Sequence, residues 1–224
     1  MRTLYAVGVA LALLARAGVA IAAPAPVYDP RSAATQEVAT LSGGCFWGMQ
    51  GVFQHVKGVS QVVAGYTGGS ADTAQYETVS GGDTGHAESV QITFDPQKIS
   101  YGQILQIFVT VAADPTELNY QGPDEGTQYR SVIWYEPTDH QQQIASDYLA
   151  QLTRLKTFSS PIVVQLDPAR AFYPAEGYHQ NFLVLHPDNP YIAYNDIPKL
   201  QALQAQFPQF YAAKPVLYAV AGSN

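Results

Sequence analysis

The chain has 224 residues, a length that fits one domain of medium size with tails. Apolar residues make up 47% of the chain, enough to bury a sizeable core, and the formal net charge is −7. So acidic a chain lacks the basic face with which nucleic-acid-binding proteins meet phosphates, and the same charge argues against docking on an anionic membrane surface.

Residues 1–22 have the three-part build of a secretory signal peptide. Arg2 precedes an apolar run from Leu4 to Ala15, and Ala20-Ile21-Ala22 has the small-x-small pattern of a cleavage site. The run is shorter than the roughly 20 residues that a membrane-spanning helix needs. We therefore predict an exported, periplasmic protein without stable membrane insertion. The alternative is a membrane anchor formed by an uncleaved N-terminus.

Residues 23–36 are rich in Ala and Pro and show neither helical nor strand periodicity, which predicts a linker. A single catalytic domain is predicted to cover residues 37–211. Residues 212–224 then form a short tail, which we expect to be loosely held.

Hydrophobic periodicity within the domain predicts a core in the order strand, helix, strand, strand, helix, strand. These elements are expected at residues 38–41, 46–57, 59–66, 90–94, 100–109 and 131–135, with Ser100 as the N-cap of the second helix. Further elements are expected as a helix at 137–156, a strand at 161–166, and helices near 178–185 and 197–207. The order is that of the split βαβ, ferredoxin-like core. We therefore predict an α/β protein of the α+β type, with a mixed sheet, flanking helices and long functional loops.

The chain contains a single cysteine, Cys45, which excludes an intramolecular disulfide. Such a residue is a buried inert thiol, an intermolecular partner or a reactive group. Cys45 follows Gly44 at the start of a predicted helix, where unpaired N–H groups and the helix dipole favour a thiolate. The position predicts an activated nucleophile, although glycine at a strand-to-helix turn is common. Phe46 lies on the apolar stripe of that helix and suits plain core packing, whereas Trp47 lies off the stripe and is the better candidate for a pocket.

Four ordered sequence blocks resemble those of the type A peptide methionine sulfoxide reductases. They are GCFWG at 44–48, GDTGHAE at 82–88, GTQYRS at 126–131 and AEGYHQ at 175–180. The resemblance covers roughly residues 37–210. It implies an enzyme that needs no cofactor and reduces the S epimer of methionine sulfoxide, free or within peptides, and so repairs oxidised proteins.

The resemblance also implies roles for individual side chains. Cys45 would attack the sulfoxide sulfur, and Glu88 would protonate the leaving oxygen. Phe46 and Trp47 would receive the methyl group of the substrate. A carboxyl group that donates a proton near neutral pH needs a raised pKa, which burial provides. Glu88 has the strand parity of the apolar Val90, so we expect it to face inward, although without the resemblance a buried Glu with a structural partner would be the favoured interpretation.

Three further residues are assigned in the same way. Tyr76 and Tyr129 would hydrogen-bond the sulfoxide oxygen, and Asp124 would hold the substrate backbone. The chain has 15 tyrosines, most of which must be structural, so the two assignments rest on the resemblance. Pro123 and Glu125 depart from the Asn and His common at these positions in the family, which predicts only a change in loop shape.

A second departure concerns recycling. Many members of the family carry further cysteines near the C-terminus, and this chain has none after Cys45. The sulfenic acid formed at Cys45 must then be reduced by another molecule. A thiol protein of the thioredoxin or glutaredoxin type, or a small thiol, would serve.

Two other kinds of function are compatible with parts of the sequence. Cys45, His179 and an Asp could form a hydrolase triad, but Glu88 and the aromatic pair would then have no role. An exported sensor could bind sulfoxide peptides or oxidants and report oxidation through Cys45 without releasing methionine. The five histidines lack paired Cys/His spacing, so no metal site is predicted.

Overall fold

The computed structural model describes residues 22–137 and 140–219. The predicted signal peptide falls almost wholly on residues 1–21 and lies outside the described residues, so it stays a prediction. Within the described ranges, no helix combines the length and apolar character needed to cross a bilayer.

In the described chain, six strands form one mixed sheet in the order β7-β6-β1-β3-β2-β8. They are β1 (Glu37–Ser42), β2 (Val59–Thr67), β3 (Ala87–Phe94), β6 (Val132–Tyr135), β7 (Gln165–Pro168) and β8 (Phe172–Pro174). Neighbouring strands pair antiparallel, except that β6 and β7 run parallel. A separate hairpin pairs β4 (Tyr120–Gln121) with β5 (Asp124–Glu125).

Helices and single turns of helix connect the strands. The α-helices are α1 (Phe46–Gln54), α2 (Tyr76–Val79), α3 (Tyr101–Ile107), α4 (Gln141–Arg154), α5 (Phe182–Leu185) and α6 (Ile197–Gln206). The 3-10 turns are η1 (Ala71–Thr73), η3 (Thr127–Tyr129) and η4 (Gly177–His179), and the π-helical turns are η2 (Phe108–Ala112) and η5 (Ile192–Asp196).

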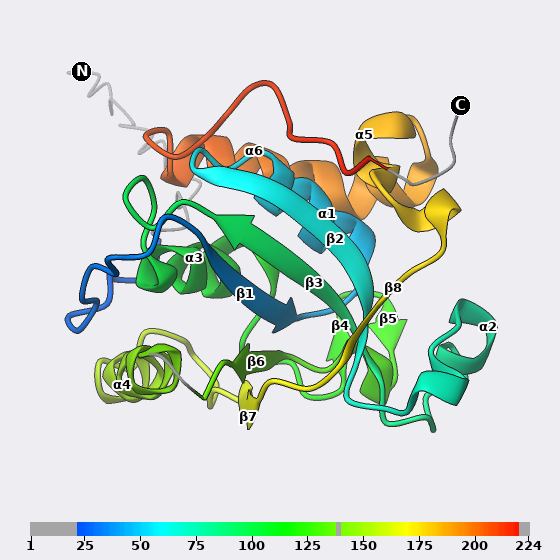
Figure 1. Ribbon diagram of the computed structural model, residues 1–224, viewed down its shortest axis with the longest axis horizontal. Helices are drawn as coiled ribbons and strands as arrows, with labels where there is room; N and C mark the ends of the chain where they lie inside the picture. Colours follow the sequence, from blue (N-terminus) through cyan, green and yellow to red (C-terminus); the bar gives the residue numbers. More distant parts are fainter. Residues whose placement is uncertain (1–21, 138–139, 220–224) are drawn as a thin grey trace, which may run out of the picture.

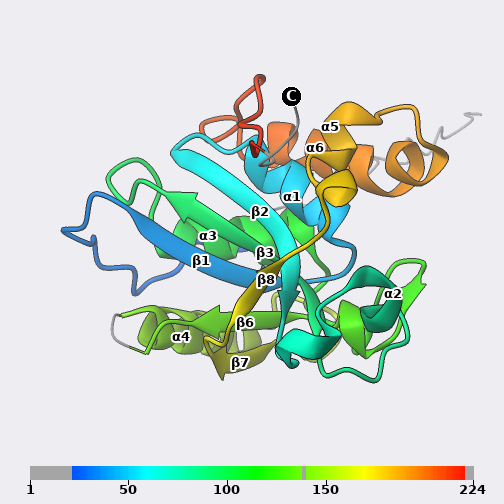
Figure 2. The same cartoon turned by 45° about the vertical axis from the view of Figure 1, so that its right-hand side comes forward.

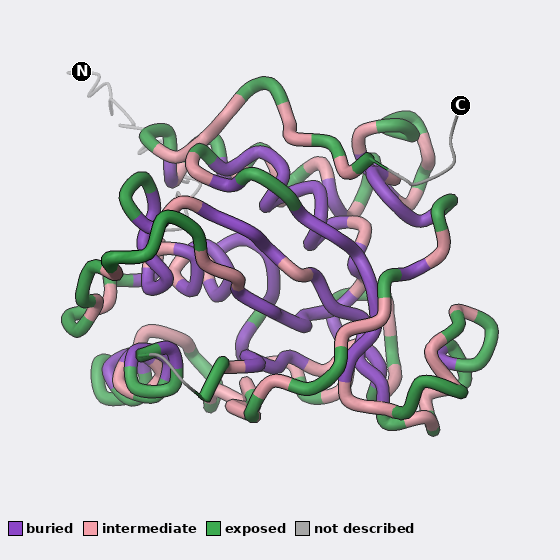
Figure 3. Tube along the Cα trace, viewed as in Figure 1, coloured by how far each residue is buried: buried purple, intermediate pink, exposed green. Residues whose placement is uncertain are grey.

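The predicted ferredoxin-like core is confirmed. β1, α1, β2, β3, α3 and β6 carry the split βαβ order along the chain, and their strands lie in the sheet as β6-β1-β3-β2. Figures 1 and 2 show α1 and α3 against the same face of this curled sheet, as right-handed crossovers require. Figure 3 shows the central strands and α1 as the buried part of the molecule, with the lobe around α2 largely exposed.

Some boundaries differ from the sequence prediction for reasons of tertiary structure. The helix expected at 178–185 is split into η4 and α5, because the Gln180 side chain bonds the backbone of Ala64 and Asn181 has a φ of +59°. The strand expected at 161–166 is shifted to β7, and the β8 strand was not predicted. Both elements extend the edges of the core sheet.

The segments that flank the domain are tied to it. Residues 23–36 form no helix or strand, and the Ala23 amide donates to Thr110 Oγ1 at 3.2 Å. The tail was expected to be loosely held, and the structure differs. The Ala212 and Val216 amides donate to the carbonyls of His55 and Gln54, at 2.8 and 3.0 Å, at the C-terminal end of α1. Helix ends leave such carbonyls without a partner, so the tail satisfies groups that the helix itself cannot.

Ser100 caps α3, as the sequence predicts. Its Oγ accepts the Gln103 amide at 3.2 Å, the Gln103 side chain accepts the Ser100 amide at 2.9 Å, and the hydroxyl donates to Asp29. We expect Ser100→Ala to lower the free energy of unfolding by about 1–2 kcal/mol, because the cap and its link to residue 29 are lost together. Urea unfolding measures this. Ser159→Ala, at an exposed position, is the control, and an equal loss in both variants would refute the capping role.

Candidate active site

Cys45 is the N-cap residue of α1, in the turn that joins β1 to this helix. Gly44 precedes it with a φ of +87°, a conformation that L side chains rarely adopt. A Cβ at Gly44 would also lie 2.6 Å from the Cβ of Gln121. The glycine therefore permits both the sharp turn and the close approach of the β4–β5 hairpin to the cysteine.

The structure brings all seven predicted site residues to one cavity of about 170 Å³. Four different parts of the fold supply them: the start of α1, the start of α2, β3, and the segment from β5 to η3. The cavity is lined by Cys45, Phe46, Trp47, Tyr76, Glu88, Asp124, Tyr129 and one residue that the sequence did not indicate, Tyr191. We call it the sulfur cavity, because the thiol of Cys45 lies in its wall.

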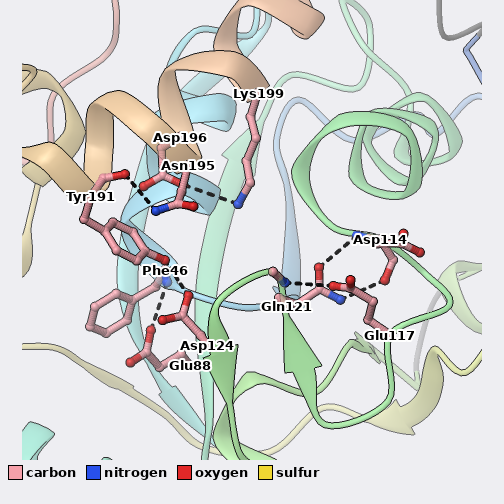
Figure 4. Close-up of polar contacts among 11 residues, drawn as sticks. Phe46, Glu88, Asp114, Glu117, Gln121, Asp124, Tyr191, Asn195, Asp196 and Lys199 are labelled. Atoms are coloured by element: carbon pink, nitrogen blue, oxygen red, sulfur yellow. Dashed lines mark hydrogen bonds and ion pairs between the residues drawn. The ribbon is translucent and has the colours of Figure 1, made fainter.

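Glu88 faces inward on β3, as its strand parity predicts, and is 3% exposed. One carboxyl oxygen accepts the backbone N–H of Phe46 at 2.9 Å, which is the first amide of α1 (Figure 4). Burial raises the pKa of Glu88 to about 8, and the negative charge of Asp124 adds to the rise, although the Phe46 amide opposes it. The carboxyl group is therefore protonated at neutral pH and can donate a proton into the cavity.

The structure does not support the expectation that the helix start makes Cys45 a thiolate. Burial raises the pKa of Cys45 well above its ordinary value. At the alkaline pH at which the thiol would ionise, the carboxylates of Glu88, Asp196 and Asp124 add to this effect. The Trp47 backbone N–H lowers the pKa, as expected at a helix start, but it is outweighed. The resting enzyme therefore holds a thiol, next to a neutral Glu88.

Aromatic rings form one wall of the sulfur cavity. The Trp47 indole stacks on Phe182, with ring centroids 3.8 Å apart, and its Nε1 donates to His179 Nδ1 at 3.0 Å. Burial lowers the pKa of His179, which keeps the imidazole neutral and able to accept this bond. His179 thus orients Trp47, and this bond leaves the hydrolase-triad alternative without its base.

The two tyrosines reach the cavity from different segments, Tyr76 from α2 and Tyr129 from η3. Tyr76 begins α2, and its amide donates at 3.0 Å to Glu176, which also accepts the Tyr66 hydroxyl at 2.8 Å. Burial and the charge of Glu88 raise the pKa values of Tyr76 and Tyr129. Both phenols therefore stay protonated and can donate hydrogen bonds to an oxygen held beside Glu88.

We expect Tyr129→Phe to slow, about 5- to 50-fold, the sulfoxide reduction that the four-block resemblance implies, because one hydrogen bond to the developing oxygen charge is lost. Tyr76→Phe should have an effect of similar size. Tyr178→Phe, at a position 61% exposed and outside the cavity, is the matched control. Single-turnover rates measure the difference, and a Tyr129→Phe rate equal to that of the control would remove this phenol from the reaction.

Tyr191 is the lining residue that sequence reasoning missed. The Tyr191 amide donates to Asn189 Oδ1 at 2.9 Å. The Tyr191 hydroxyl donates to the Asp124 carboxylate (Figure 4). The bond fixes Asp124 beside Cys45. The only signal in the sequence is the Asn189-Pro190 turn before it, which does not single out one tyrosine among 15.

Asp196 is a second charged group near the thiol, and it is fully buried. Its carboxylate lies against Gly48 in the first turns of α1, where any Cβ would collide with it. Lys199 forms an ion pair with Asp196 at 3.3 Å. Asp196 and Lys199 are three residues apart at the start of α6, a spacing from which the ion pair could have been predicted. The sequence does not show that this pair lies near Cys45.

A thiol at a helix start, a neutral buried carboxylic acid and a wall of aromatic rings define a cysteine-dependent enzyme on an α+β scaffold. The family model described as "Peptide methionine sulfoxide reductase" matches residues 37–211. The chain belongs to this family.

Individual relatives agree with the family model. A peptide methionine sulfoxide reductase, MsrA 2, of Mesorhizobium japonicum is 58% identical over 189 residues, which cover 84% of this chain and 96% of the relative. MsrA 2 of Synechocystis is 45% identical, over 82% of this chain and 87% of the relative.

Two solved structures support the same fold. Methionine sulfoxide reductase A of Corynebacterium diphtheriae is 30% identical with a TM-score of 0.56, over 70% of this chain and 78% of that one. Reduced Mxr1 from Saccharomyces cerevisiae is 28% identical with a TM-score of 0.61, over 73% of this chain and 92% of that one.

Proposed function

We propose that this protein reduces methionine-S-sulfoxide, free or in peptides, to methionine, and so repairs oxidised proteins. The observation that carries the proposal is the meeting of Cys45 with a buried, neutral Glu88 in one cavity. A sulfoxide oxygen is a poor leaving group until it is protonated, and this carboxyl group supplies the proton. The aromatic wall, which includes Phe46 and Trp47, offers an apolar surface for the methyl group of the substrate.

The reaction balances without a cofactor. Cys45 Sγ attacks the sulfoxide sulfur, while Glu88 protonates the oxygen and Tyr76 and Tyr129 donate hydrogen bonds to it. The thiol proton of Cys45 replaces the one that Glu88 gave. The oxygen ends on the cysteine, so that a thiol and a sulfoxide become a sulfenic acid and a thioether. We assign to Asp124, which lines the same cavity, the role of holding a backbone N–H of the substrate.

Recycling requires an outside reductant. No second cysteine exists to close a disulfide, so a thiol donor must reduce the sulfenic acid of Cys45. We assign this role to a protein of the thioredoxin or glutaredoxin type or to a small thiol. If the predicted signal peptide is cleaved, this donor works in the periplasm.

Turnover of purified epimers with dithiothreitol tests the proposal. We expect methionine to form from the S epimer of a sulfoxide peptide, with little or none from the R epimer. Binding of the peptide without release of methionine would instead identify a sensor. Equal turnover of the two epimers would contradict the assigned stereochemistry.

A further inference from the structure

Cys45 lines a second cavity, which the reduction of methionine sulfoxide does not use. This cavity has a volume of about 200 Å³ and shares Cys45, Asp124 and Tyr191 with the sulfur cavity. The rest of its wall comes from residues 111–114, Glu117, the β4–β5 hairpin, and the segment from η5 to the start of α6. We call it the rear cavity. In Figure 4, Asp124 lies between Glu88, which lines the sulfur cavity, and Gln121 and Lys199, which line the rear cavity.

The rear cavity is held open by polar contacts. Gln121 bridges to the backbone of Asp114, accepting its amide at 2.9 Å and donating to its carbonyl at 2.7 Å. Asn195 Nδ2 donates to the Tyr191 carbonyl at 3.0 Å, and Lys199 is held by buried Asp196. Because these groups are fixed by one another, the cavity exists before any ligand enters it.

The reduction of a sulfenic acid by a thiol requires access to the cysteine sulfur from the side opposite to its oxygen. The proposed reaction delivers the oxygen to Cys45 in the sulfur cavity, which Glu88 also lines, so the sulfenic oxygen is expected on that side, within reach of the Glu88 proton. A thiolate that displaces this oxygen attacks the sulfur from the side opposite to the leaving group, as in thiol–disulfide exchange. Cys45 lines both cavities, whereas Glu88 lines the sulfur cavity and not the rear cavity.

We propose that the rear cavity is the entry site of the reducing thiol, which attacks the Cys45 sulfenic acid from there. The proposal rests on the proposed function, since it needs the sulfenic acid which that reaction forms. In the step, an S–S bond forms between the donor and Cys45, the S–O bond breaks, and Glu88 protonates the hydroxide to water. The proton that the donor thiol loses to solvent replaces the one that Glu88 gave. A second donor thiol then attacks the mixed disulfide, which leaves the donor oxidised to a disulfide and Cys45 reduced.

Asn195 and Tyr194 allow a matched test, because they are adjacent in η5. Asn195 lines the rear cavity, whereas Tyr194 is 83% exposed. Asn195→Trp places a large ring at the cavity, and Tyr194→Trp adds a similar ring outside it. Gly122→Asn is a second, milder obstruction, because a Cβ at Gly122 meets no atom within 4 Å and Asn tolerates its φ of +57°.

The two half-reactions are measured separately in each variant. The pre-reduced enzyme first reacts with one equivalent of sulfoxide peptide, and the methionine burst is recorded. Dithiothreitol, or thioredoxin with its reductase, is then added, and the return of the free Cys45 thiol is followed. We expect Asn195→Trp to recover the thiol at least tenfold more slowly than Tyr194→Trp, with bursts that differ far less, and Gly122→Asn to be slowed in the same direction.

The possible outcomes distinguish failure of the rear-entry proposal from failure of the proposed reductase function. Slower recovery with dithiothreitol alone identifies a small thiol as the occupant, and slower recovery with thioredoxin alone identifies a protein cysteine; either supports the rear entry. Recovery in Asn195→Trp and Gly122→Asn as fast as in Tyr194→Trp, with both donors, overturns it. A wild-type enzyme that forms no methionine burst would instead overturn the proposed function.

Discussion

Cys45→Ser is expected to abolish reduction of methionine-S-sulfoxide with dithiothreitol, by about a thousandfold or more. The serine hydroxyl has nearly the size of the thiol, but it is a far weaker nucleophile toward sulfur and cannot accept the oxygen as a sulfenic acid. No other thiol in the chain can take over, since Cys45 is its single cysteine. Steady-state methionine formation with the S epimer measures the loss.

The control for this variant is its fold. Cys45 is half-buried at a helix start, where serine is a good N-cap residue, so we expect the free energy of unfolding to change by less than about 1 kcal/mol. Loss of activity in a stably folded Cys45→Ser enzyme then reports chemistry. Turnover above a few per cent of the wild-type rate would require a different nucleophile.

Glu88→Gln is expected to slow the methionine burst by about 10²–10⁴-fold. The amide oxygen of Gln can still accept the Phe46 N–H, so the contact that positions the side chain is kept, while the transferable proton is lost. Because the pKa of Glu88 is raised to about 8, the wild-type burst should be fast at neutral pH and fall as the pH rises through about 8. Cys45 titrates well above this window, so its ionisation does not mask the fall.

Two features separate this role from a structural one. Glu88→Gln should lack the fall near pH 8, since it has no group that ionises there. Glu77→Gln, an exposed neighbour of Tyr76 on α2, should keep both the wild-type burst and its pH profile. A burst in Glu88→Gln that still declined near pH 8 would assign the titration to another group.

The sequence predicted what depends on local pattern. Strand parity placed Glu88 inside the sheet beside Val90, and the box at Ser100 marked the start of α3. The strand and helix order gave the ferredoxin-like core, because each core element carries its own periodicity. The resemblance of four blocks then selected the seven residues that line the sulfur cavity.

The properties that the sequence could not give come from residues far apart in the chain. The thiolate expected at Cys45 followed from the helix start, which acts locally. Burial of the thiol by the folded chain raises its pKa instead, and the carboxyl groups of Glu88 and Asp196, from other segments, add to the rise. The break at Gln180 likewise depends on its bonds to Ala64, more than a hundred residues away. Tyr191 reached the cavity only through the folding of the segment before α6.

In the proposed reaction, Cys45 takes the oxygen of the substrate. The most direct test of this step is a single turnover of the pre-reduced enzyme without any donor, stopped and analysed by mass spectrometry. We predict one methionine per enzyme molecule and a mass gain of one oxygen on the peptide that contains Cys45. Methionine released with an unmodified Cys45, or an oxygen found on another residue, would contradict the account.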